Sequence, residues 1–415
     1  MYKDREIAKD NQSSGRSTSD AGESEYMNLE ELPDRGDDAC SDRRMEEALG
    51  AEATTQDVEL KRLSRVPKPN PRYLSSLDYL LLTDSNESEC YKEAMQMRPS
   101  SFPEGMTINS NLHKNTTCPR GTVLIRRTTK NDLLHAKTLQ NHVKRHVTSY
   151  PSEKDKTSIG IGSHYAVMKT TIGEYYGASA KLIVYGFPNI KVDQSTISQI
   201  WVIGGATGPL DEVNAIQAGW HVCPSLYGDY LTHLSISWTA DGYDTGCYNL
   251  HCQGFMVISR DFSPGMEITQ LSTYGGIQKA IDISIFKDPD EGNWWLTYGE
   301  ERSLVGYWPK ELFNNLEKPN EVDYGGASYS PYNEPSPPMG SGHMPCEGPN
   351  KTCYFLNIKL VNKKNQLYNP KSNRVKILSN RPDYYGIDGN YYSGYPDGYK
   401  FRYGGPGGYT RMKEV

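Results

Sequence analysis

The chain has 415 residues and a formal net charge of −6, with 30 tyrosines, 38 glycines and 25 prolines. Tyrosine favours the half-buried surfaces of strands, and glycine and proline favour tight turns, so the composition predicts an all-β protein. The weak net charge argues against nucleic acid as a partner, and no run of about 18 apolar residues is present that could span a membrane.

The first part of the chain is far more acidic than the rest. Residues 1–60 carry 17 acidic and 7 basic side chains but only two aromatic ones, Tyr2 and Tyr26. A segment with high charge and few apolar groups cannot offset the entropy lost on ordering, so residues 1–65 are predicted to be a disordered tail. The opening MYKDREIAKDNQSSG has no apolar core and cannot serve as a signal peptide.

The cysteines and sequons nevertheless indicate a secretory compartment, which favours a true start further upstream. Cys247–Cys252 and Cys346–Cys353 enclose short loops bounded by Gly or Pro, so each pair is predicted to form a local disulfide. Neither pair has histidines at metal-ligand spacing, so zinc is the weaker interpretation and no metal or cofactor is expected. The pairing stays open for Cys40, Cys90, Cys118 and Cys223. Glycosylation is predicted at Asn86, Asn115 and Asn350.

Behind the tail, the prolines of residues 66–71 predict an extended linker, followed by a small unit with a helix-compatible stretch near 90–97. From His164 onward the chain reads as strands, many with period-two alternation, separated by glycine-rich turns. The predicted strands are 166–170, 180–185, 197–203, 218–222, 234–239, 255–259, 281–286, 294–298, 304–308, 322–326 and 354–360. No long helical pattern interrupts them, which predicts an antiparallel β-sandwich of two sheets. The tyrosine- and glycine-rich stretch 384–409 is expected at the edge of this sandwich.

Seven motifs, in order and spacing, resemble the neprosin family of secreted plant peptidases. They are TCPRGTVLIRRTTKNDLL (117–134), EYYGASAKLIVY (174–185), NAIQAGWHVCPSLYGD (214–229), TADGYDTGCYNLHCQGF (239–255), KDPDEGNWWLTYG (287–299), GYWPKELF (306–313) and PPMGSGH (337–343). The resemblance implies a β-sandwich domain at 113–410, preceded by an activation segment at 66–112. It also implies secretion, glutamic endopeptidase activity after proline, and proline-containing peptides or proline-rich proteins as partners; oligomeric state stays open.

The two positions that matter most for activity are both substituted. In the family one catalytic glutamate usually stands where this chain has Gln217, and the second follows a Gly-Gly pair, which here is followed by Ala327. Such hydrolysis needs one carboxylate to activate water and another to donate a proton. A glutamine can still donate to an oxyanion, but a methyl group can neither accept nor donate a proton. The chain is therefore expected to have lost glutamic peptidase activity or to retain very little.

Two other interpretations stay open. In the first, the chain is an active endopeptidase in which Gln217 is the oxyanion donor and a displaced acid replaces the second glutamate. Asp323 is the candidate, because even spacing places it on the same strand face as Ala327. Turn or solvated roles fit the other nearby acids better, namely Asp211, Glu212, Glu321 and Glu334. In the second, the chain is a non-catalytic module that binds proline-rich peptides or wall glycoproteins.

Besides Asp323, four residues are expected at the cleft. His221 shares even spacing with Gln217 and is expected on the cleft wall with its ring hydrogen-bonded. Most tryptophans should lie in the core, but Trp220 and Trp238 are candidates to stack on proline rings. His343, in a glycine-rich motif, is expected to make a loop contact beside the cleft.

Overall fold

The computed structural model describes residues 96–106, 133–134, 136, 161–331 and 334–409. By compactness the chain divides into residues 1–34 and 35–415. The first unit lies wholly outside the described residues, and all described residues belong to the second. The expectations for the acidic tail 1–65, for Asn86 and Asn115, and for most of segment 66–112 also fall outside the described residues.

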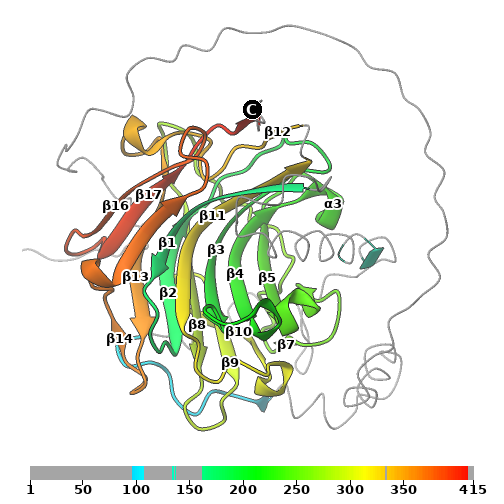
Figure 1. The fold of residues 1–415 in the computed structure, drawn as a ribbon, viewed down its shortest axis with the longest axis vertical. Helices are drawn as coiled ribbons and strands as arrows, with labels where there is room; N and C mark the ends of the chain where they lie inside the picture. Colours follow the sequence, from blue (N-terminus) through cyan, green and yellow to red (C-terminus); the bar gives the residue numbers. More distant parts are fainter. Residues whose placement is uncertain (1–95, 107–132, 135, 137–160, 332–333, 410–415) are drawn as a thin grey trace, which may run out of the picture. The chain divides into compact units, whose positions relative to one another are not determined.

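Two large antiparallel sheets make up most of the described part, which confirms the predicted all-β sandwich (Figure 1). The seven-stranded sheet has the order β15-β1-β11-β3-β4-β5-β6. Its strands are β1 (Ile161–Thr170), β3 (Ser195–Gly204), β4 (Asn214–Val222), β5 (His233–Ala240), β6 (Thr245–Tyr248), β11 (Glu321–Pro331) and β15 (Val375–Ser379). Every neighbouring pair in it is antiparallel.

The second sheet has the order β16-β17-β13-β2-β8-β9-β10-β7, with β14 paired to β13. Its strands are β2 (Gly177–Ile183), β7 (Met256–Val257), β8 (Ala280–Lys287), β9 (Trp294–Tyr298), β10 (Ser303–Trp308), β13 (Cys353–Val361), β14 (Leu367–Tyr368), β16 (Gly386–Tyr392) and β17 (Tyr399–Gly404). A two-stranded sheet pairs β12 (Pro335–Ser336) with β18 (Gly408–Tyr409). From residue 161 onward the helical elements are short: α3 (Pro224–Tyr227) and the 3-10 turns η3 (Leu210–Glu212), η4 (Asp241–Tyr243), η5 (Lys310–Leu312), η6 (Pro345–Glu347) and η7 (Ser372–Arg374).

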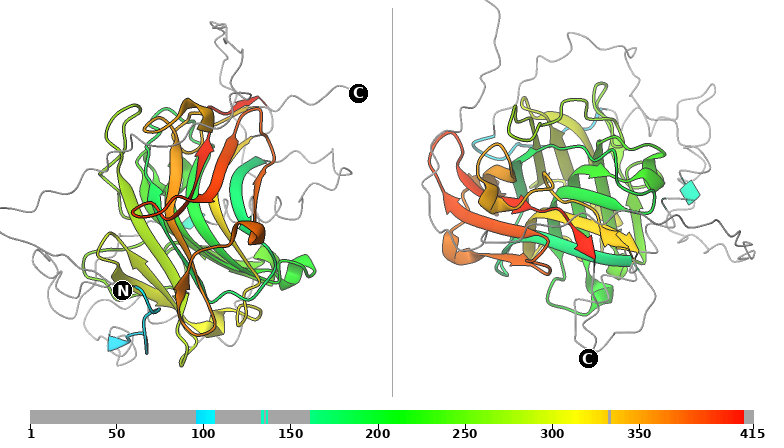
Figure 2. Two further views of the ribbon diagram at one scale, coloured as in Figure 1. Left: turned by 90° about the vertical axis from the view of Figure 1, so that its left-hand side faces the viewer. Right: turned by 90° about the horizontal axis from the view of Figure 1, so that it is seen from above.

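Each of the strands predicted from residue 166 onward is present, and β9 has the predicted bounds. Sequence reasoning missed β6, β12 and β14–β18, which are short or rich in glycine and tyrosine. The tyrosine-rich stretch 384–409 supplies β16 and β17, which lie at one edge of the nine-stranded sheet as expected (Figure 2). No helix in the described part of the chain is long and apolar enough to cross a membrane.

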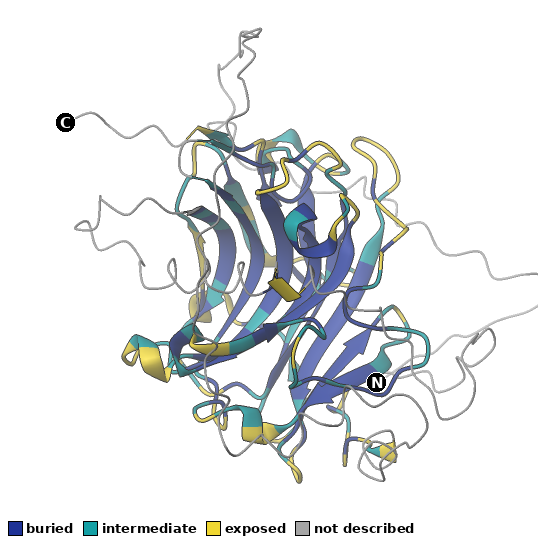
Figure 3. Cartoon of the chain, turned by 90° about the vertical axis from the view of Figure 1, so that its right-hand side faces the viewer, coloured by how far each residue is buried: buried dark blue, intermediate teal, exposed yellow. Residues whose placement is uncertain are grey.

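The core lies between the two large sheets, and most strand residues are buried (Figure 3). Trp220 on β4 is fully buried, and its Nε1 donates a hydrogen bond across to the Ile183 carbonyl of β2 at 2.9 Å. The expectation that Trp220 lines a cleft is therefore wrong, because strand alternation turns it toward the other sheet. Trp294, Trp295 and Trp308 are buried as expected for core residues.

Residues 96–106, the described part of the predicted activation segment, pack against the nine-stranded sheet. The Phe102 ring lies 5.8 Å from that of Phe286, and Ser100 Oγ donates to Asp288 Oδ1 at 2.8 Å. Main-chain hydrogen bonds join Glu104 to the β13–β14 hairpin on both sides, through Asn365 O at 2.7 Å and Leu367 N at 3.0 Å.

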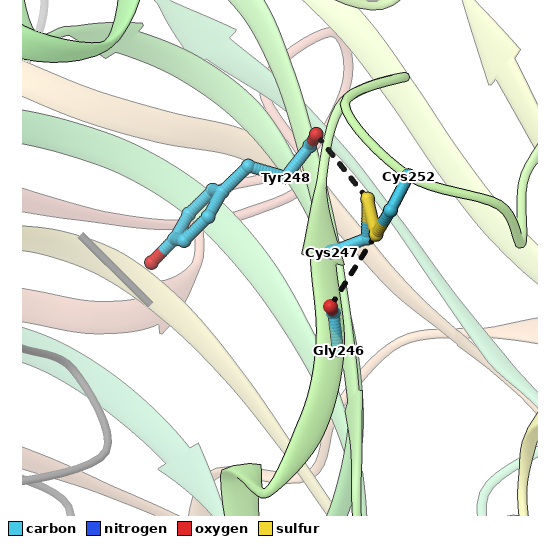
Figure 4. The surroundings of a disulfide bond; sticks show 4 residues. All are labelled: Gly246, Cys247, Tyr248 and Cys252. Carbon is cyan, nitrogen blue, oxygen red and sulfur yellow. Dashed lines mark hydrogen bonds between the residues drawn. A yellow bond between two sulfur atoms is a disulfide. The ribbon is translucent and has the colours of Figure 1, made fainter. Parts of the chain in front are cut away.

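The two predicted local disulfides have different outcomes. Cys247–Cys252 is present at the end of the seven-stranded sheet (Figure 4). The predicted Cys346–Cys353 bond is wrong. Cys353 is a buried free thiol within 3.4 Å of the Ile183 carbonyl and of Tyr403 Oη, and burial raises its pKa to about 12. Cys346 is exposed on η6 and is disulfide-bonded, but not to Cys353. A short loop does not bring the two sulfurs together, because one faces the core and the other faces solvent.

Candidate active-site cleft

A cavity of about 140 Å³ lies on the face of the seven-stranded sheet that is turned away from the core. Its lining residues from β1, β3, β4 and β11 are all odd-numbered, whereas even-numbered Trp220 faces the other sheet. This alternation follows from the two-residue period of a strand. The cavity therefore contains both positions at which the neprosin resemblance places a glutamate, Gln217 and Ala327.

Strand register arranges the central cavity residues of β11, β3 and β4 in three parallel rows. We name each row by one member: the Gln217 row (Asp323, Trp201, Gln217), the Gln199 row (Gly325, Gln199, Gly219) and the His221 row (Ala327, Ile197, His221). Gln217 and Ala327 are thus two strands and two rows apart. Strand spacing of about 4.8 Å and a rise of about 3.3 Å per residue separate their Cα atoms by roughly 16 Å.

Gln217 keeps a hydrogen-bonding group directed at the cavity. Its side chain is partly exposed, and its Oε1 accepts a hydrogen bond from Ser237 Oγ on β5 at 3.0 Å. No described residue accepts a hydrogen bond from its Nε2, which leaves the amide N–H groups available to a ligand oxygen. Ala327 is only 4% exposed and brings a methyl group to the cavity wall.

Asp323 lines the cavity on the same face as Ala327, as expected from their even spacing. The side chain is buried, and Oδ1 has no hydrogen-bond partner among the described residues. Burial and the nearby Glu321 raise the pKa of Asp323 well above its ordinary value. Lys169 opposes this shift, but its Nζ lies closer to Glu321 (2.9 Å) than to Asp323 (3.6 Å). The buried carboxyl is therefore held toward its protonated form.

His221 is on the cavity wall as expected, but its ring is not hydrogen-bonded. It is 2% exposed, and neither Nδ1 nor Nε2 has a partner among the described residues. Its ring is nearly perpendicular to that of Tyr227, with ring centroids 5.7 Å apart. Burial, and secondly the neighbouring His233, lower the pKa of His221 to about 3. His233 itself is fully engaged, with Nδ1 2.8 Å from the Gly265 carbonyl and Nε2 2.7 Å from Asp229.

The lowered pKa of His221 predicts acid sensitivity. Above pH 6.5 the ring is neutral in both folded and unfolded chains, so its stabilising contribution is fully present. As pH falls from 6.5 towards 3, only the unfolded chain takes up the proton, and stability is lost by about 1.4 kcal/mol per pH unit. We therefore expect His221→Phe to gain stability relative to wild type across this window. Urea unfolding of both proteins from pH 3 to 7 measures the difference, and a pH-independent difference would contradict a buried neutral imidazole.

Two further residues expected at the cleft do not line the cavity. Trp238 borders a smaller hollow of about 20 Å³ next to Gln217, with its ring edge-on to Phe313 at 5.9 Å. His343 stacks on Tyr274 at 3.9 Å, and its Nδ1 lies 3.0 Å from Glu347, away from the sheet. A loop contact is thus the correct interpretation of His343.

Sequence reasoning missed most of the aromatic lining of the cavity. The missed residues are Tyr165, Trp201, Tyr243, Tyr248 and Tyr329. Trp201 lies at even spacing from Gln199 on β3, but only the register of β3 with β4 and β11 shows that it lies between Gln217 and Asp323. Asp211 and Glu212 have the turn role expected, in η3, and Glu334 pairs with Lys191 at 3.0 Å. Glu321 has neither a turn nor a solvated role, because it lies in β11 and its largely buried side chain pairs with Lys169 at 2.9 Å.

A β-sandwich with a cleft on one sheet is the class of domain that the fold and this cavity define. The family model described as Neprosin matches residues 192–406, slightly more than half of the chain. The chain belongs to the neprosin family, so the domain is that of a peptidase family. All three rows of the cavity lie within the matched residues.

Two solved structures are similar to this chain. One is Scytalido-glutamic peptidase with a peptide-based transition state analogue, at 9% identity over 59% of this chain and 98% of that one, with a TM-score of 0.33. The other is SCP-B, a member of the Eqolisin family of peptidases, in a complex with the tripeptide Ala-Ile-His. Its identity is 8% over 59% of this chain and 98% of that one, and its TM-score is 0.32.

Proposed function

We propose that this protein binds proline-containing peptides in the cavity of the seven-stranded sheet and has lost the two-glutamate hydrolysis of its family. One observation carries the proposal: Ala327 presents a methyl group to the cavity where the family has its second glutamate. Gln217, at the first position, can donate hydrogen bonds but cannot act as a base. Loss of one general acid or base typically lowers the rate by a factor of about 100 to 10,000, and here both are replaced.

The aromatic lining supports binding without catalysis. Trp201 and four tyrosines surround the cavity, and aromatic-lined grooves bind proline-rich segments because these are already ordered in an extended polyproline conformation. Family membership and the Cys247–Cys252 disulfide support an extracellular, secreted plant protein. Glycosylation of Asn350 belongs to the same proposal; the residue is partly exposed, in the turn after η6.

A second candidate function, residual hydrolysis, is favoured by Asp323. Its carboxyl is buried in the cavity, has a raised pKa and has one unpartnered oxygen, as a general acid requires. Against it stands geometry. Trp201 lies directly between Asp323 and Gln217 in their row, so its side chain stands between the acid and the oxyanion donor, which must both reach one scissile carbonyl. Impaired catalysis is therefore our conclusion.

The test measures binding and cleavage on the same sample. The full chain is mixed at pH 4 to 6 with an end-blocked proline-containing peptide, and binding is followed by calorimetry and products by mass spectrometry. We expect binding without cleavage. Cleavage that Asp323→Asn abolishes would establish the second candidate and overturn the first. A wild-type protein that neither binds nor cleaves would disprove the proposed peptide cleft.

A further inference from the structure

Two buried polar side chains in the cavity have no role in the function proposed above. Gln199 is 1% exposed and His221 is 2% exposed, and both line the cavity. Gln199 Oε1 and both ring nitrogens of His221 have no hydrogen-bond partner among the described residues. Buried polar atoms in folded proteins are nearly always hydrogen-bonded, because an unsatisfied group loses its hydration without compensation. Three such atoms in one cavity indicate a ligand that supplies the missing partners.

Gln199 has no side chains beside it on the two neighbouring strands. Its row neighbours on β11 and β4 are Gly325 and Gly219. Main-chain packing enforces both glycines. Gly325 has a φ of +152°, and a Cβ at Gly219 would lie 1.9 Å from the Ser198 carbonyl oxygen. Gln199 is therefore the only residue of its row of three that carries a side chain.

The spacing of Gln199 and His221 matches that of a peptide backbone. Gln199 pairs with Gly219, two residues before His221, so the two side chains are diagonal neighbours across β3 and β4. Diagonal neighbours lie about 7–8 Å apart. In an extended peptide, backbone groups two residues apart on one edge repeat every 6.6–6.8 Å or so. The pair can therefore contact successive amide groups along one edge of an extended chain.

The chemistry of the pair selects the kind of amide. A neutral imidazole has one donor and one acceptor nitrogen, and a glutamine Oε1 is an acceptor. Burial holds His221 neutral and so preserves both roles. A secondary amide offers the complementary N–H and C=O groups, whereas the amide nitrogen of proline has no N–H to donate.

We propose that His221 and Gln199 form a subsite that hydrogen-bonds two backbone amides of an extended peptide, at positions occupied by residues other than proline. The inference rests on the proposed peptide cleft. It adds a requirement on the peptide, an N–H group at particular positions, that Gln217, Ala327 and the aromatic lining do not impose. Proline is held elsewhere in the cavity, and the subsite fixes which neighbouring residues must carry an N–H group.

The test combines protein variants with peptides in which single N–H groups are removed. Calorimetry measures the binding of acetyl-Ala-Ala-Pro-Ala-Ala-amide and of its singly N-methylated analogues to the full chain. We expect His221→Phe and Gln199→Met each to weaken binding of the parent peptide about three- to tenfold, the effect of one hydrogen bond. The matched control is His164→Phe, which replaces a buried histidine on the even-numbered, core-facing side of β1 and should leave affinity unchanged.

Combining the protein variants with the N-methylated peptides gives a double-mutant cycle between protein and peptide. At one non-proline position, N-methylation of the peptide should weaken its binding to the wild type by the same three- to tenfold. Binding to His221→Phe or to Gln199→Met, which has already lost that contact, should not weaken further on methylation. The subsite is disproved if both variants bind like wild type, or if methylation weakens all proteins equally, and the peptide cleft then still stands. If a variant fails to fold, binding of the N-methylated peptides to the wild type is the test. If no methylation weakens that binding, the wild type makes no hydrogen bond to a peptide N–H group and the subsite is disproved. Absence of any wild-type binding overturns cleft and subsite together.

Discussion

Replacing Gln217 and Ala327 together by glutamate is expected to produce post-proline cleavage at least about 100-fold above that of the wild type. Both new carboxyl groups would face the same cavity. At position 327 the group would be buried beside Ile197, which raises a carboxyl pKa and suits a general acid. At position 217 the group would be partly exposed and hydrogen-bonded by Ser237, which keeps it ionised as a base. Environments that separate two carboxyl pKa values are what this chemistry requires.

The matched control for this gain is Gln217→Glu combined with Ala327→Gln. Glutamine at position 327 has nearly the size and polarity of glutamate but cannot transfer a proton. Initial rates on an end-blocked proline-containing peptide, measured from pH 3 to 7, compare the two double variants. The floor between the positions is partly clear, because Gly219 and Gly325 flank Gln199. Equal rates for both variants would show that these positions no longer support the family's reaction in this chain.

Trp220→Ala is expected to be the most destabilising of the substitutions considered, with a loss of about 3–5 kcal/mol in the free energy of unfolding. Trp220 is fully buried between the sheets, and its removal leaves a cavity and deprives the Ile183 carbonyl of its hydrogen-bond donor. Urea unfolding monitored by circular dichroism measures the loss. Gln217→Ala is the control on the same strand; it should change stability much less, because the side chain is partly exposed.

The outcome also separates two roles for Trp220. If Trp220 is a core residue, its substitution destabilises the protein, and the molecules that remain folded bind peptide normally. If Trp220→Ala were as stable as wild type yet failed to bind peptide, Trp220 would belong to the cleft and its placement between the sheets would be wrong.

Strand positions and the facing of residues within one strand were predictable from the sequence. Period-two alternation located the strands, since each strand has one face packed on a core. The even spacing of Gln217 with His221, and of Asp323 with Ala327, correctly placed each pair on one face. Trp220 is three residues from Gln217, and this odd spacing places it on the opposite face of β4.

Predictions that depended on contacts between distant segments were less successful. Cys247–Cys252 was predictable because the strand end and its loop determine it locally. Cys346–Cys353 was not, because Cys353 is drawn into the core by the pairing of β13 with β2 and β17. The edge strands β15 and β16 were not predicted either, because exposed strands lack an apolar pattern on one face.

The sequence by itself determined the all-β class, the family, and the replacement of both glutamate positions by Gln217 and Ala327. Only the tertiary structure decided that these positions are two rows apart and that Trp201 separates Asp323 from Gln217. It also decided that Gln199 lies between two glycines, and that Gln199 Oε1 and both ring nitrogens of His221 lack hydrogen-bond partners among the described residues. The physical reason is that alternation is a property of one strand. The relative positions of residues on β4 and β11 depend on the register of both strands with β3, which is set by pairing and packing over the whole sheet.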